Sequence, residues 1–66
     1  MNYIRGYCKT NLDNFDCSIV NVFCSVPKIG DRVRVLYKKN VTTLKVCKIT
    51  HDQQNGEPFI VVELTN

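Results

Sequence analysis

The chain has 66 residues, a formal charge of +3 and four cysteines. A chain this short buries only about 60% of the surface that its unfolded form exposes, so we expect one domain over residues 1–66 and no deep catalytic cleft. Its longest apolar stretches, 18–26 and 58–64, are far shorter than a membrane span. Because no apolar run of signal-peptide length opens the chain, we expect a soluble cytoplasmic protein that does not bind membranes.

The first predicted strand covers Asn2–Lys9. Successive side chains of a strand point to opposite faces. One face of this strand therefore alternates rings with cations, namely Tyr3, Arg5, Tyr7 and Lys9. A polar loop follows over residues 10–16, and one short helical turn is expected near residues 12–16.

The second predicted strand, Cys17–Val26, has apolar side chains on both faces. We expect Val20 and Val22 to face inward, with Ile19 and Phe23 on the outer face. A strand with this pattern is covered on both sides or lies at an interface.

Proline and glycine in residues 27–31 indicate a turn before a third strand over Asp31–Lys39. This strand alternates cleanly, as a half-buried antiparallel strand does. The inward residues are Val33, Val35 and Tyr37, and the outward ones are Arg32, Arg34, Leu36 and Lys38.

A tight turn at Lys39-Asn40 leads into the fourth predicted strand, Val41–Thr50. Its apolar residues Val46 and Ile49 are three apart, so a β-bulge near Cys47 is needed to place both on one face. Residues 51–57 contain Asn55-Gly56, a strong turn signal.

The last predicted strand is Glu57–Leu64, with Ile60, Val62 and Leu64 inward and Phe59, Val61 and Glu63 outward. Five short strands joined mostly by hairpins bury one face if the sheet curls into a barrel. The sequence therefore predicts an all-β fold, a small five-stranded, partly open antiparallel barrel. The alternative is an exposed antiparallel sheet that pairs with a second copy.

Two segments carry a resemblance to a known group of proteins. They are the runs 26–35, with its Pro-x-x-Gly-Asp turn before a valine-rich strand, and 46–51. Together they resemble small SH3-like barrel proteins of bacterial and phage genomes, over about residues 17–65. The resemblance implies the barrel fold and no particular activity, since small barrels have many functions.

The sequence contains no residue pattern typical of a metal site or of a catalytic site. Cys47 and His51 are four apart, but no C-x-x-C pair starts a zinc site. In a cytosolic setting thiols stay reduced, and we expect free, buried cysteines. Asp52 is the one obvious carboxylate to orient His51. We therefore expect no catalytic residues, no metal and no cofactor.

Positive charge is concentrated in residues 28–48, which hold seven cations and one acid. Rings that stack on bases, interleaved with cations that contact phosphates, are typical of small barrels that bind single strands. The candidate nucleic-acid-binding residues are Arg32, Arg34, Lys38, Lys45 and Lys48, with Tyr3, Arg5, Tyr7 and Lys9 as a second face. The same residues can equally form a solvated surface.

Apolar residues on the predicted outer face indicate a protein interface instead. These candidates are Ile19, Phe23, Leu36, Phe59 and Val61. The leading hypothesis is a non-catalytic protein-interaction module or subunit, encoded by a phage or mobile element, that binds a protein partner or itself as a homodimer. The alternative is a small nucleic-acid-binding barrel.

Overall fold

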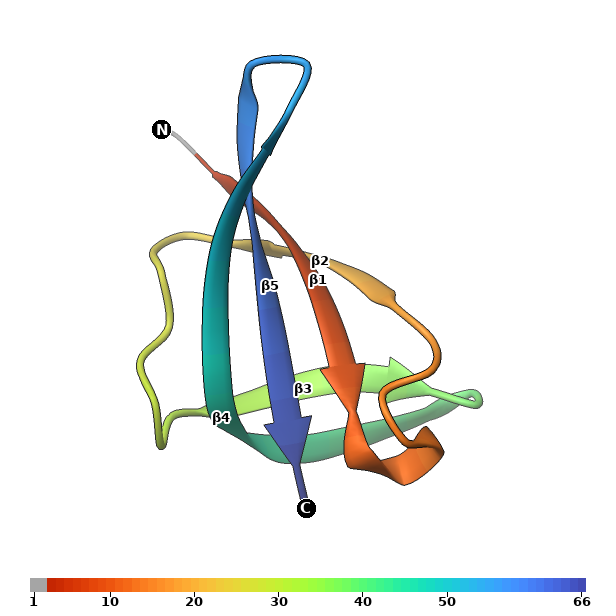
Figure 1. The fold of residues 1–66 in the computed structure, drawn as a ribbon. Helices are drawn as coiled ribbons and strands as arrows, with labels where there is room; N and C mark the ends of the chain where they lie inside the picture. Colours follow the sequence, from red (N-terminus) through yellow and green to blue (C-terminus); the bar gives the residue numbers. More distant parts are fainter. Residues whose placement is uncertain (1–2) are drawn as a thin grey trace.

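The computed structural model describes residues 3–66 and confirms the all-β fold (Figure 1). Asn2, where the first predicted strand begins, lies outside the described residues. The elements are β1 (Ile4–Thr10), the 3₁₀ turn η1 (Asn11–Asp13), β2 (Ile19–Phe23), β3 (Arg32–Tyr37), β4 (Asn40–Gln54) and β5 (Glu57–Thr65). The helical turn expected near residues 12–16 is one short 3₁₀ turn that begins one residue earlier and ends at Asp13.

The strands form one sheet in the order β2-β1-β5-β4-β3, which curls into a nearly closed barrel. Its edge strands β2 and β3 approach one another but do not pair, so a seam remains open. The sheet is mixed rather than purely antiparallel, because β1 and β5 run parallel. The two strands lie at opposite ends of the chain, and parallel strands are not joined by a tight turn. No local sequence pattern therefore predicts this pairing.

The strand β4 bends and joins the two halves of the barrel. It pairs with β3 over residues 40–45 and with β5 over residues 45–54. A register shift between Val46 and Lys48 confirms the predicted bulge and brings Val46 and Ile49 to the inner face.

Residues 51–54, predicted to be loop, extend β4 and pair with β5 in an arm that projects beyond the barrel (Figure 1). Pairing continues to the tip because Asn55 and Gly56 both adopt positive φ, 53° and 80°, as a two-residue hairpin turn requires.

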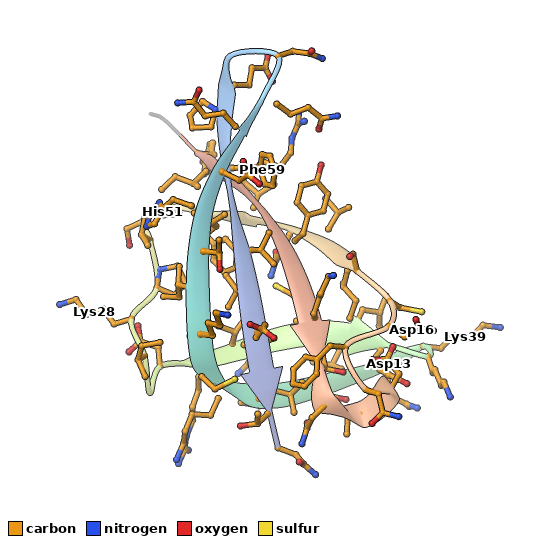
Figure 2. The ribbon with its side chains drawn as sticks, in the orientation of Figure 1. Asp13, Asp16, Lys28, Lys39, His51 and Phe59 are labelled. Carbon is orange, nitrogen blue, oxygen red and sulfur yellow. The ribbon has the colours of Figure 1, made fainter. Side chains whose placement is uncertain are left out.

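The turn between β3 and β4 is made by Lys38 and Lys39, one residue earlier than predicted. Both have positive φ, 47° and 68°, so the turn twists with the strands that it joins. Lys38 is therefore a turn residue and not part of the outer face of β3; its Nζ lies 5.4 Å from the centroid of the Tyr37 ring. Lys39 lies on the same side of the molecule as Asp13 and Asp16 (Figure 2).

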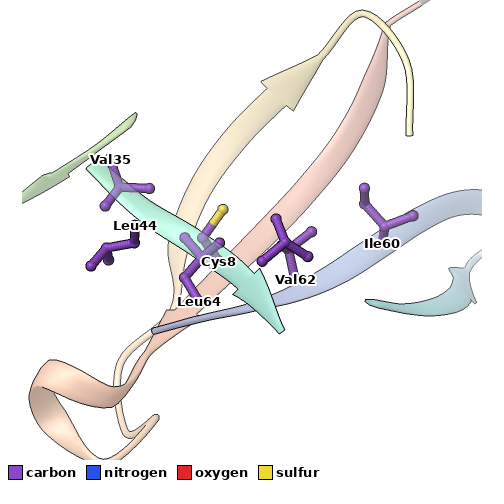
Figure 3. Close-up of a cluster of buried hydrophobic side chains, with 7 residues drawn as sticks. Cys8, Val35, Leu44, Ile60, Val62 and Leu64 are labelled. Atoms are coloured by element: carbon purple, nitrogen blue, oxygen red, sulfur yellow. The ribbon is translucent and has the colours of Figure 1, made fainter. Parts of the chain in front are cut away.

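The core fills the inside of the barrel (Figure 3). Its buried hydrophobic members come from β1, β3, β4 and β5: Cys8, Val35, Leu44, Val46, Ile60, Val62 and Leu64. The expected inward residues of the last strand, and Val35 of the third, are thereby confirmed. Burial of these side chains supplies most of the stabilisation available to so small a domain.

The predicted orientation of the second strand is wrong. Ile19 and Phe23 pack against the core, and Val20 and Val22 face solvent. The reason lies in the neighbouring strand: Gly6 has no side chain, and a Cβ at this position would collide with Cε2 of Phe23. The Phe23 ring therefore occupies the space that the glycine leaves, and β2 is fixed with its odd-numbered residues inside.

Candidate interaction surfaces

An apolar strip crosses the outer face of the sheet over β2, β1 and β5. We define this apolar strip as Tyr3, Tyr7, Val20, Val22, Phe59 and Val61. The strand register builds it: Tyr7 lies opposite Val20 on one side and Val61 on the other. Tyr3 shares a shallow groove with Val22 just before β1 begins.

Half of the apolar strip is open to solvent. Val20 is 66% exposed, Tyr3 60% and Val22 57%. The other three members are half-buried, and the Tyr7 and Phe59 rings meet edge to face with centroids 5.3 Å apart. The strip therefore has a firm aromatic centre, with exposed aliphatic side chains beside it on the edge strand β2.

Charges of both signs surround the strip. Arg5 lies 3.9 Å from the Glu57 carboxylate, and Lys48 lies 3.9 Å from that of Glu63. On the parallel side, Lys9 is the register partner of Glu63. Each of these three cations thus has an acidic neighbour.

A second surface is the outer face of the β3–β4 hairpin, and its cations have no such neighbours. We define this basic hairpin face as Arg32, Arg34, Leu36, Val41, Thr43 and Lys45. Arg32 lies directly opposite Lys45, Arg34 opposite Thr43, and Leu36 opposite Val41. Within residues 3–66 no ion pair involves Arg32, Arg34 or Lys45.

A shallow groove of about 310 Å³ runs beside this face. Arg32, Lys45 and the threonines Thr43 and Thr65 line it, together with Leu44 and Asn66. Asn66 is held in place by Asn11, whose Oδ1 accepts a hydrogen bond from the Asn66 amide at 3.2 Å. The groove is therefore lined by cationic and hydroxyl hydrogen-bond donors, and the Asn11–Asn66 hydrogen bond fixes one of its sides.

The structure divides the predicted nucleic-acid-binding residues between the two surfaces. Arg32, Arg34 and Lys45 are on the basic hairpin face. The remaining residues belong to the strip or its rim, except for the turn residue Lys38: they are Tyr3, Arg5, Tyr7, Lys9 and Lys48. Rings and unpaired cations are thus not interleaved on one face as the sequence suggested.

The predicted interface residues are divided as well. Ile19 and Phe23 lie inside, Phe59 and Val61 belong to the strip, and Leu36 is 63% exposed on the basic hairpin face. Sequence reasoning missed Val20 and Val22 because their strand is apolar on both sides. It also missed Val41, 71% exposed, whose only signal is its place directly opposite Leu36 across the hairpin.

Three of the four free cysteines are exposed, so the expectation of buried thiols holds only for Cys8. Burial raises the pKa of the Cys8 thiol. Cys47 is the bulged residue, and its thiol donates to the Glu63 carbonyl oxygen at 3.2 Å. Among the described residues no three His, Cys, Asp or Glu side chains cluster in a way that could hold a metal ion.

A hollow of about 680 Å³ lies where the β4–β5 arm leaves the barrel. Ile4, Val26, His51 and Ile60 are among its lining residues. His51 pairs with the inward residue Ile60, whereas Asp52 pairs with the outward residue Phe59. These neighbours therefore point to opposite faces of the strand, and Asp52 does not orient His51.

Comparisons of the chain with protein-family models, with curated proteins and with solved structures gave no match. The resemblance to SH3-like barrels therefore stays a prediction. In the part of the chain that the structure describes, no helix has the length and apolar character needed to cross a membrane.

Proposed function

We propose that this chain is a non-catalytic protein-interaction module whose apolar strip packs against another protein surface, either a second copy or a different chain. The observation that carries the proposal is the strip itself, which places Val20, Val22 and Tyr3 in solvent beside the Tyr7–Phe59 ring pair. The three exposed free cysteines of the chain fit a reducing compartment such as the cytoplasm.

The composition of the strip supports this function. The centres of protein interfaces are enriched in aromatic residues and arginine and are surrounded by a polar rim. Here the aromatic centre is Tyr7 with Phe59, and Arg5 with Glu57 forms part of the rim. Covering an exposed valine such as Val20 or Val22 contributes on the order of 1 kcal/mol, which is a useful supplement for a domain of this size.

The rim also favours a second copy as one partner. At one end of the strip Arg5, Asp52 and Glu57 give a charge of −1, and at the other Lys9, Lys48 and Glu63 give +1. Two copies packed face to face with strand directions reversed bring these opposite ends together. Complementary potentials of this kind fix the orientation of a complex.

The test is light scattering coupled to gel filtration over a wide protein concentration range. Val20→Glu places a charge in the strip, and Leu36→Glu is the control, because it charges a similarly exposed position outside it. We expect self-association that Val20→Glu abolishes and Leu36→Glu leaves intact. For a heterologous partner, proximity cross-linking in cells should show the same dependence on Val20. A monomer without any contact that depends on Val20 would contradict the proposal.

A further inference from the structure

The basic hairpin face contains an uncompensated repulsion. Arg32 and Lys45 are register partners on adjacent strands, and like charges directly opposite one another destabilise a sheet. Of the nearby acids, Asp31 uses its carboxylate to accept a hydrogen bond from the Lys28 amide at 2.9 Å. In residues 3–66 no acidic side chain forms an ion pair with either cation. The fold therefore leaves room for an anion from outside.

The groove beside these two cations has the donors that an oxyanion needs. Arginine and lysine supply several N–H donors, and each threonine hydroxyl supplies one. Arg32, Lys45, Thr43 and Thr65 all line the groove, and none of its lining residues has an acidic side chain. Such a set of donors matches a phosphate group, which accepts hydrogen bonds on several oxygens.

The rest of the face fits a chain of such groups. Arg34 follows Arg32 two residues along β3, on the same side and about 6.6 Å away at ordinary strand spacing. The next row is the exposed apolar pair Leu36 and Val41. A strand with unstacked bases can place an apolar base face on this pair, whereas a duplex hides its base faces within the stack.

We propose that the basic hairpin face binds single-stranded nucleic acid through its phosphate backbone, with one phosphate held between Arg32 and Lys45. No aromatic ring lies among the residues of this face, since the alternation of β3 turns Tyr37 inward. Contacts to phosphates carry no sequence information. Binding should therefore be indifferent to sequence and strongly dependent on salt. This function is independent of the apolar strip.

Fluorescence anisotropy with a labelled, mixed-sequence single-stranded DNA tests the proposal. The site variant is Arg32→Gln/Lys45→Gln, and the matched control is Lys28→Gln/Lys39→Gln, which loses the same charge. Lys28 and Lys39 extend away from the barrel on opposite sides (Figure 2). At low salt we expect at least tenfold weaker binding for the site variant and less than a twofold change for the control. Because the two cations share one phosphate, the site variant should also reduce the magnitude of the salt slope by about 0.7.

Each other outcome overturns the proposal or part of it. Equal losses in both variants would show that only net charge matters. If the native protein does not bind DNA at low salt, the proposed site is wrong. If it binds a duplex with equal affinity, the preference for single strands is wrong. If polyglutamate competes as effectively as nucleic acid, the site binds carboxylates as well as phosphates, and the assignment to nucleic acid is wrong. Circular dichroism confirms that the site variant is folded, and retained DNA binding by Val20→Glu separates this proposal from the strip.

Discussion

On the outer face of β1, β5 and β4, the cations around the apolar strip each have an acidic neighbour, whereas on the β3–β4 hairpin Arg32 lies opposite Lys45. Both faces are exposed and both mix charged with apolar side chains. They differ in which charged residues the strand pairing places opposite one another. The charges around the strip sum to zero, with −1 at one end and +1 at the other, and they surround an apolar surface. The basic hairpin face has three cations without an acidic partner among the described residues. The arrangement of charges, more than their number, separates the two.

The largest effect should come from reversing charge on the basic hairpin face. We expect Arg32→Glu/Lys45→Glu to weaken binding of single-stranded DNA more than tenfold, because both attractive contacts to the shared phosphate become repulsive. Self-association through the strip should not change. Anisotropy and light scattering on the same preparations measure both. A parallel loss of the two properties would mean that the surfaces are not independent.

The strip depends on how β2 is seated on β1, and Gly6 tests that seating. We expect Gly6→Ala to lower the free energy of unfolding by about 1–3 kcal/mol, because the added methyl group collides with the Phe23 ring. Urea denaturation measures the change. In a Phe23→Leu background the same substitution should cost less, since the ring is gone. An equal cost in both backgrounds would show that Phe23 is not the cause.

Stability should respond with opposite sign on the two faces. We expect Lys45→Glu to raise the free energy of unfolding by about 0.2–1 kcal/mol, because it replaces a repulsive cross-strand pair with an attractive one. Glu63→Gln should lower it by a similar amount, since Glu63 lies between Lys9 and Lys48. Both changes should shrink in 1 M salt. Changes of the same sign would contradict the comparison.

The smallest effect at neutral pH is the contribution of the buried Cys8 thiol to the pH dependence of stability. Burial raises the pKa of Cys8 above its ordinary value of 9.0. Above pH 9 the unfolded chain therefore loses this proton before the folded protein does, and stability falls as the pH rises. Denaturation of native protein and Cys8→Ala between pH 8 and 10.5 should show a shallower decline in the variant. Equal slopes would mean that the thiol does not contribute.

Much of the fold could be predicted from local patterns. The alternation in the third and last strands placed Val35, Ile60 and Leu64 inside, and the three-residue spacing of Val46 and Ile49 located the bulge. The second strand could not be oriented in this way, because valine and isoleucine occupy both of its faces. For the candidate surfaces, the sequence placed Arg32, Arg34 and Lys38 on one face and left open whether Lys45 or Lys48 lies beside them. It could not identify their neighbours.

The sequence by itself determined the all-β class, the positions of the two hairpin turns to within a residue, and the concentration of positive charge in residues 28–48. These properties depend on residues close together in the chain. Only the tertiary structure decided that β1 and β5 pair in parallel, that Phe23 fills the space over Gly6, and that Glu63 lies between two lysines while Arg32 opposes another. Each of these is a contact between residues distant in sequence, fixed by strand register and packing rather than by local preference.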